Sequence, residues 1–198
     1  MNSVDMEEKQ FFARWFKMLF IIMVISVIAS LMASDIANAY LPILVPIGNV
    51  IGVITSAAYA ISLIVMAKYN EHYKTAGMAN LLSMASSVAL LFTGSVIDAA
   101  MNATFSVILL FLAIFAAFHE FAGHIEVTHS RFGKVSSQWS TLWKWTLASY
   151  VVQLISAVIL FISVDIAAIL VLIYALLVLV TGVLKIIMLY RTASYYAE

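Results

Sequence analysis

The sequence predicts an all-α integral membrane protein with six transmembrane helices arranged as three helical hairpins. Of its 198 residues 65% are hydrophobic and only 10% are charged, and the apolar residues form long unbroken runs. A soluble domain has about 45–50% apolar and about 25% charged residues. Because a chain of this size leaves much of its surface facing solvent, lipid must form a large part of that solvent. The apolar runs also lack the alternating pattern of membrane β-barrel strands.

The length of the apolar runs predicts six spans. A helix needs about 20 apolar residues to cross about 30 Å of hydrocarbon. The segments that meet this length form a single transmembrane domain over residues 1–198, with short turns after the first, third and fifth spans. The predicted spans are residues 18–34, 41–67, 76–96, 104–124, 145–164 and 166–187.

The basic residues predict how the spans are oriented. All 10 Lys and Arg lie before the first span, between spans two and three, between spans four and five, or at the end of span six. Because cytoplasmic loops are enriched in Lys and Arg, both termini of this multi-pass protein are expected on the cytoplasmic side of the cell membrane. Lys185, at the inner end of the last span, is expected to extend its side chain to the inner interface.

The three outer turns resemble one another. Each carries an aspartate followed by small or apolar residues, at Asp35, Asp98 and Asp165. Many membrane folds are built from internal repeats. Acidic residues are also common in the outer turns of ordinary hairpins, so this short match leaves both internal repetition and three unrelated hairpins open.

Small residues in span two predict a helix interface, since close contact between membrane helices requires short side chains. They recur at every fourth position as Gly48, Gly52, Ser56 and Ala60, and spans two and three are expected at the centre of the bundle.

Polar residues in spans two and three have two interpretations. They either line a pocket or pathway for a solute, or hydrogen-bond across a packed interface, which is the commoner role of such residues. The candidates are Asn49, Asn80, Ser83 and Ser87.

Span four ends in a group of ionisable residues, His119, Glu120 and His124, followed by Glu126. Such residues are costly inside a membrane and indicate function by default. The helical period places Glu120 and His124 on one face and His119 and Glu126 on another. A zinc or iron site formed by His119, Glu120 and His124, or a proton relay, would suit these groups. The simpler interpretation is a helix end that emerges into the cytoplasm and needs no ligand.

Composition narrows the function classes. The chain has no Cys and a formal net charge of zero, so thiolate chemistry is excluded and no nucleic-acid partner is expected. No cofactor is required by the sequence, and an enzyme is not the expectation. The preferred hypothesis is a non-enzymatic transport or small-molecule-binding membrane subunit. Its expected partners are membrane lipid, a small-molecule ligand, and a second copy or another membrane subunit.

Two alternatives stay open. One is a structural, regulatory or immunity-type protein that acts through partner helices. The other is a small membrane enzyme or redox protein with a metal site at the cytoplasmic end of span four.

The size and six-span layout are similar to those of the substrate-binding components of energy-coupling-factor vitamin transporters. The first span carries Ala29-Ser30-Leu31-Met32-Ala33, which fits the AxxxA face through which those components meet their partner. The resemblance implies a transport role with a separate energy-coupling chain. Here the AxxxA lies at the outer end of the span, and the outer loops are too short to form an obvious lid.

Overall fold

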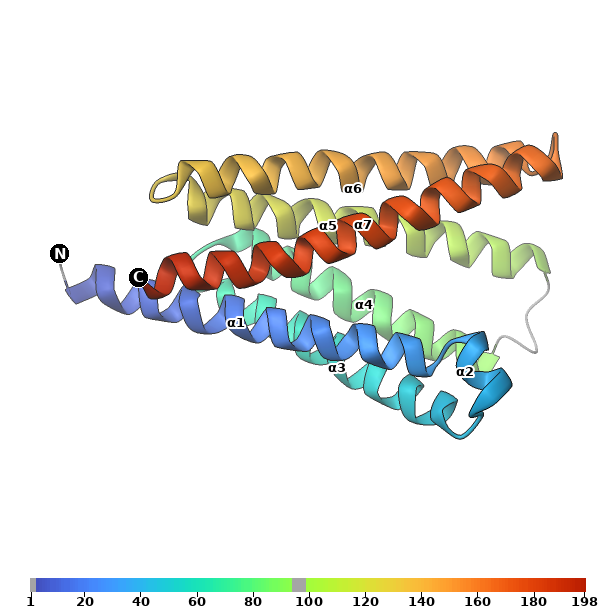
Figure 1. Cartoon of the computed structure of the whole chain (residues 1–198), viewed down its shortest axis with the longest axis horizontal. Coiled ribbons are helices and arrows are strands. Elements are labelled where there is room, and N and C mark those ends of the chain that lie inside the picture. Colours follow the sequence, from blue (N-terminus) through green and yellow to red (C-terminus); the bar gives the residue numbers. More distant parts are fainter. Residues whose placement is uncertain (1–2, 94–98) are drawn as a thin grey trace.

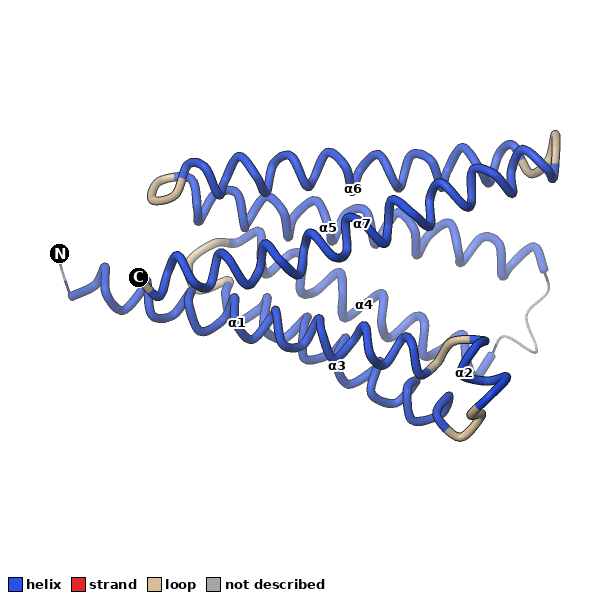
Figure 2. Tube along the Cα trace, in the orientation of Figure 1, coloured by secondary structure: helices blue, strands red, loops and turns tan. Residues whose placement is uncertain are grey.

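The computed structural model describes residues 3–93 and 99–198, and these residues are helical apart from short turns. Figure 1 shows the long helices running along one direction, with the short α2 at the end opposite to both termini. Figure 2 shows the turns gathered at the two ends of the helices. The helices of the described residues are α1 (Ser3–Met32), α2 (Asp35–Tyr40), α3 (Leu44–Met66), α4 (Glu71–Thr93), α5 (Ala99–His129), α6 (Gly133–Ile159) and α7 (Val164–Ala197).

The long helices form a closed ring. Each packs against the next long helix along the chain, and α1 also packs against α7. Figure 1 shows α1, α3 and α4 on one side and α5 and α6 on the other, with α7 crossing from α6 to α1 as it nears the termini. The two groups approach each other near the termini and separate toward α2. The ring therefore has a tight end near the termini, here called the inner end, and a wider end, here called the outer end.

Five helices of the described chain are long and apolar enough to cross a membrane: α1, α3, α5, α6 and α7. They support an all-α, polytopic membrane protein. The predicted third span, residues 76–96, corresponds to α4, which is not among the five, and the end of this span lies outside the described residues. So does Asp98, in the turn expected to close the second hairpin.

Two outer helix starts share the same capping chemistry. The Ser34 side chain accepts a hydrogen bond from the backbone N–H of Ala37 at the start of α2, at 3.2 Å. Ser163 accepts one from the N–H of Ile166 at the start of α7, at 3.4 Å. A serine oxygen in this position satisfies a free N–H of the first turn. The nearby acidic residues Asp35 and Asp165 also lie where the helix dipole favours a negative charge.

The helices at the inner end are longer than the predicted spans. Residues 125–144, expected to be a cytoplasmic connection, are mostly helix, because α5 continues to His129 and α6 begins at Gly133. Helix α7 continues past Ile187 to Ala197. These extensions are amphipathic, with only one face apolar, so a continuous hydrophobic run does not reveal them.

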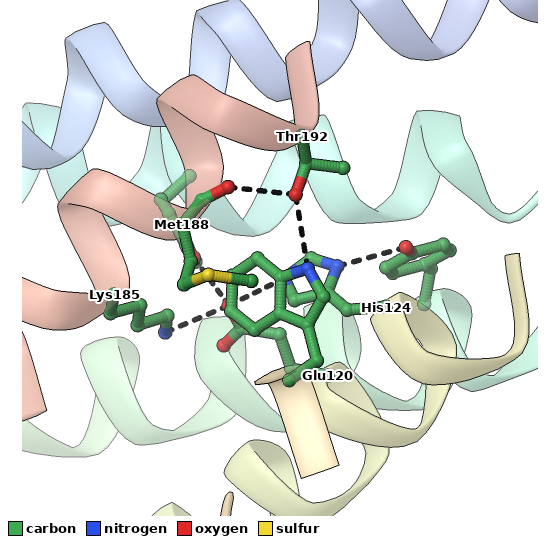
Figure 3. Close-up of polar contacts among 8 residues, drawn as sticks. Glu120, His124, Lys185, Met188 and Thr192 are labelled. Atoms are coloured by element: carbon green, nitrogen blue, oxygen red, sulfur yellow. Dashed lines mark hydrogen bonds and ion pairs between the residues drawn. The ribbon is translucent and has the colours of Figure 1, made fainter. Parts of the chain in front are cut away.

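The extensions enclose an aromatic core at the inner end. Trp139 of α6 donates a hydrogen bond from Nε1 to the Thr192 hydroxyl at 3.0 Å, and Thr192 donates to the carbonyl oxygen of Met188 at 2.7 Å (Figure 3). The Tyr196 hydroxyl donates to the carbonyl oxygen of Val127. The largest fully buried side chains of this core are Trp139, Tyr73, Tyr196, Phe12, Phe16 and Phe121.

Two glycines allow close contacts between helices. A Cβ atom at Gly48 would lie 2.7 Å from the carbonyl oxygen of Ala29 and 2.8 Å from the nitrogen of Ala33. A Cβ atom at Gly77 would lie 2.7 Å from the carbonyl oxygen of Ala60. Gly48 therefore brings α3 onto α1, and Gly77 brings α4 onto α3. This differs from the AxxxA role implied by the resemblance, because α3 covers the backbone of Ala29 and Ala33 within the same chain.

These contacts predict opposite outcomes for two alanine substitutions. Gly77→Ala should lower the free energy of unfolding by about 1–3 kcal/mol, since the backbone of α3 has to move away from the new methyl group. Gly182→Ala is the matched control, because a Cβ atom there has no neighbour within 4 Å. Alanine favours a helix over glycine by about 1 kcal/mol, so this variant should be at least as stable as the natural chain. Unfolding in detergent, followed by circular dichroism, measures both; equal stability of the two variants would contradict the close contact.

Candidate functional site

A cavity of about 580 Å³ lies inside the ring, between α1, α3 and α4. At its inner end it also reaches Lys185 of α7, which is the one charged side chain among the described residues that line it. The walls carry hydroxyl and amide groups from all three helices: Ser26, Ser30, Asn49, Ser56, Asn80, Ser83 and Ser87.

The structure brings together the four polar residues singled out in spans two and three. Asn49, Asn80, Ser83 and Ser87 all line the cavity. Ser87 donates a hydrogen bond to the carbonyl oxygen of Ser83 at 2.9 Å. The side-chain amides of Asn49 and Asn80 make no hydrogen bond to any described part of the protein. These amides are available to a ligand or to water, and their role in binding stays a prediction.

The small-residue stripe of α3 serves two purposes. Gly48 lies against α1, and Ala60 lies against Gly77 of α4. Gly52 and Ser56, expected at a packed interface, line the cavity instead, and a Cβ atom at Gly52 would have no neighbour within 4 Å. Gly48 contacts α1 toward the outer end and Ala60 contacts α4 toward the inner end, while Gly52 and Ser56 between them line the cavity.

An ion pair closes the cavity at its inner end. The Nζ atom of Lys185 lies 2.7 Å from Oε1 of Glu120 on α5, and the two side chains are 18% and 4% exposed. The Tyr59 hydroxyl of α3 donates to the same carboxylate oxygen. His124 places its Nε2 atom 3.3 Å from that oxygen. Figure 3 shows Lys185 and His124 on either side of Glu120. Three helices therefore meet at one carboxylate.

The contacts of Glu120 extend to a fourth helix. A carboxylate only accepts hydrogen bonds, so a neutral His124 donates from Nε2 and accepts at Nδ1. The hydroxyl of Tyr73 on α4 lies 2.9 Å from Nδ1 and can supply that proton. Trp139 fixes the imidazole from the side, with ring centres 4.4 Å apart. A continuous set of polar contacts thus runs from α4 through α5 to α3 and α7.

His119 belongs to a different group. Its Nδ1 atom lies 2.7 Å from Nδ1 of His72 on α4, and His72 places Nε2 3.3 Å from Glu126. The structure thus confirms the two faces that the helical period indicates. The proposed metal ligands His119, Glu120 and His124 do not converge, because consecutive residues of a helix point about 100° apart. Among the described residues, no three His, Asp or Glu side chains are grouped so that they could hold a metal.

Sequence reasoning missed the role of Lys185. It was expected to reach the inner interface, but its side chain turns inward to Glu120. The reason is that α7 continues to Ala197, so Lys185 lies well inside the helix and close to a buried carboxylate. A lysine between Leu184 and Ile186, with more helix to follow, is the signal that could have indicated an interior position.

The ion pair predicts strong coupling between two substitutions. Lys185→Met alone should lower the free energy of unfolding by about 3–5 kcal/mol, because it leaves the buried Glu120 carboxylate without its charged partner. Glu120→Met alone should lower it by less, because the remaining Lys185 ammonium lines the cavity. The double variant should recover most of this loss, since an apolar pair of similar volume often replaces a buried ion pair at little cost. Unfolding in detergent measures all three variants.

Lys134→Met provides the control for this cycle, because Lys134 is exposed in the first turn of α6. We expect it to change stability by less than about 0.5 kcal/mol. If the loss in the free energy of unfolding in the double variant equals the sum of the two single losses, the two charges do not interact.

Comparison of the chain with protein-family models, with curated proteins and with solved structures finds no match.

Proposed function

We propose that this chain is a six-span protein of the cell membrane that binds a small polar solute in the cavity between α1, α3 and α4, as a solute-binding or transport subunit. The observation that carries the proposal is the cavity itself. Its volume of about 580 Å³ falls in the range of small-molecule sites, about 300–1,000 Å³. Hydrogen-bonding groups facing a space inside an otherwise apolar bundle are costly unless they contact water or a ligand.

The position of α4 supports a sixth span. It packs between α3 and α5, both of which are candidate spans. Its 23 residues extend about 35 Å at 1.5 Å per residue, enough to cross the hydrocarbon. Its polar side chains Asn80, Ser83 and Ser87 line the cavity, so they are compatible with a place in the membrane.

The distribution of charge supports an orientation with both termini in the cytoplasm. The cavity then lies in the outer half of the membrane, between the ion pair and the turn that carries α2. Lys185 and Glu120 close it toward the cytoplasm. In this arrangement a solute enters from outside the cell.

A pair of neighbouring cysteines tests the cavity, in a chain that has no cysteine of its own. Ser83→Cys faces the cavity, whereas Leu82→Cys lies at the same depth on the outer face of α4. The S83C variant should react with a membrane-impermeant, sulfonate-bearing thiosulfonate added outside the cell at least about tenfold faster than L82C, because only a hydrated thiol ionises readily. Equal rates, or no reaction at S83C, would exclude a water-filled site.

The same approach tests the six spans and their orientation. Asn38→Cys in α2 and Met101→Cys near the start of α5 should be modified in intact cells. Glu71→Cys at the start of α4 and Lys134→Cys should react only after the membrane is made permeable. All four residues are exposed in the structure. Modification of E71C and M101C from the same side would show that α4 does not cross.

A further inference from the structure

The ammonium group of Lys185 has hydrogen-bonding capacity that the described residues leave unused. An ammonium carries three N–H donors. One is directed at Oε1 of Glu120, at 2.7 Å. Its other contacts in the described part of the chain are with aromatic faces, the rings of Tyr59 and Phe121, whose centres lie 5.2 and 5.6 Å from Nζ. Among the described residues, no second carboxylate or carbonyl oxygen accepts a hydrogen bond from this ammonium.

Only one member of the ion pair between Lys185 and Glu120 lines the cavity. Lys185 lines the cavity, whereas Glu120 lies behind it and is 4% exposed. The positive end of the pair therefore faces the cavity. No acidic side chain occurs among the described residues that line the walls, so nothing on the cavity side opposes a negative group.

We propose that the cavity binds a small carboxylate with a single negative charge, whose oxygen atoms accept hydrogen bonds from Lys185. This inference rests on the proposed function and names its class of solute. A hydrogen bond between an ammonium and a carboxylate is about twice as strong as one between neutral groups. The amides of Asn49 and Asn80 and the nearby hydroxyls provide contacts for the polar body of the solute.

The position of Glu120 favours one negative charge over two. Any anion bound to Lys185 shares the ammonium with a carboxylate that is 2.7 Å from Nζ. The attraction to Lys185 and the repulsion from Glu120 both grow in proportion to the charge on the ligand, whereas the cost of removing the ligand from water grows with the square of its charge. The site offers a single lysine and, along its described walls, no arginine, which is the residue suited to two-pronged binding of phosphate. A phosphate monoester would therefore bind poorly.

Matched pairs of acids and amides test the inference on the purified full-length chain in detergent. The probes are lactate and lactamide, nicotinate and nicotinamide, and gluconate and gluconamide. A ligand that binds only the folded state raises the unfolding temperature. We expect at least one acid to raise it and its amide to leave it unchanged. Octanoate and octanamide form a further pair of probes, which distinguishes a lipid-like carboxylate from a water-soluble one. A selective response to an acid of either kind supports the inference.

The first of two variants gives a readout that a merely structural role would not produce. Glu120→Gln removes the competing negative charge while keeping a side chain of the same shape, so it should tighten binding of the responding acid at least about tenfold. Lys185→Gln should abolish the response. Ser149→Ala, in a helix that does not line the cavity, is the control and should leave the affinity unchanged.

The outcomes separate the two proposals. Equal responses to acid and amide, with no change in E120Q, would show that the cavity binds solutes but does not select a carboxylate, which overturns the inference and leaves the proposed function standing. The absence of any response to the acids, in a protein whose S83C variant is accessible to the thiol reagent, would also overturn it. An inaccessible S83C would instead remove the proposed function itself.

Discussion

The rest of this structure depends on the burial of one carboxylate. Glu120 lies inside an apolar bundle, where an unpaired charge would cost several kcal/mol. Its Oε1 atom receives Lys185 from α7, Tyr59 from α3 and His124 from its own helix. Because all of these contacts converge on one atom, they fix the three helices relative to one another at a single depth. The cavity ends and the aromatic core begins at this level.

The two halves of the ring are held by different forces. Lipid provides no hydrophobic drive for helices to associate, so contact must come from close packing and hydrogen bonds. At the inner end, Trp139 and Tyr196 supply both, with large buried rings and hydrogen bonds to Thr192 and Val127. Toward the outer end, Gly48 joins α3 to α1, while Gly52 and Ser56 leave an opening. A firmly packed inner half allows the outer half to stay open without loss of the fold.

How far the sequence could predict this arrangement depends on the range of the interaction. The helical class follows from the apolar runs, and the pairing of Glu120 with His124 follows from a spacing of four residues on one helix. The choice of Lys185 and Tyr59 as partners arises from helices distant in sequence, which periodicity does not describe. The stripe from Gly48 to Ala60 is visible as a pattern, but only the fold shows which of its members meet a helix and which meet the cavity. The extension of α6 was missed for a different reason. Its buried residues Val135, Trp139 and Leu142 recur at helical spacing, and a search for continuous apolar runs does not detect a helix with one apolar face.

The shared ammonium links the occupancy of the cavity to the packing of the helices. Lys185 is the contact that holds α7 to the Glu120 carboxylate, and in the proposed complex it is also the group that meets the ligand. A bound carboxylate that draws the ammonium toward the cavity weakens the ion pair between Lys185 and Glu120. Conversely, any shift that strengthens this ion pair weakens binding of the ligand. By thermodynamic reciprocity, the two effects have equal coupling free energies. Solute binding would in this way be transmitted to the contact between α5 and α7 at the inner boundary of the cavity. In the proposed orientation, this is where a path to the cytoplasm would have to open.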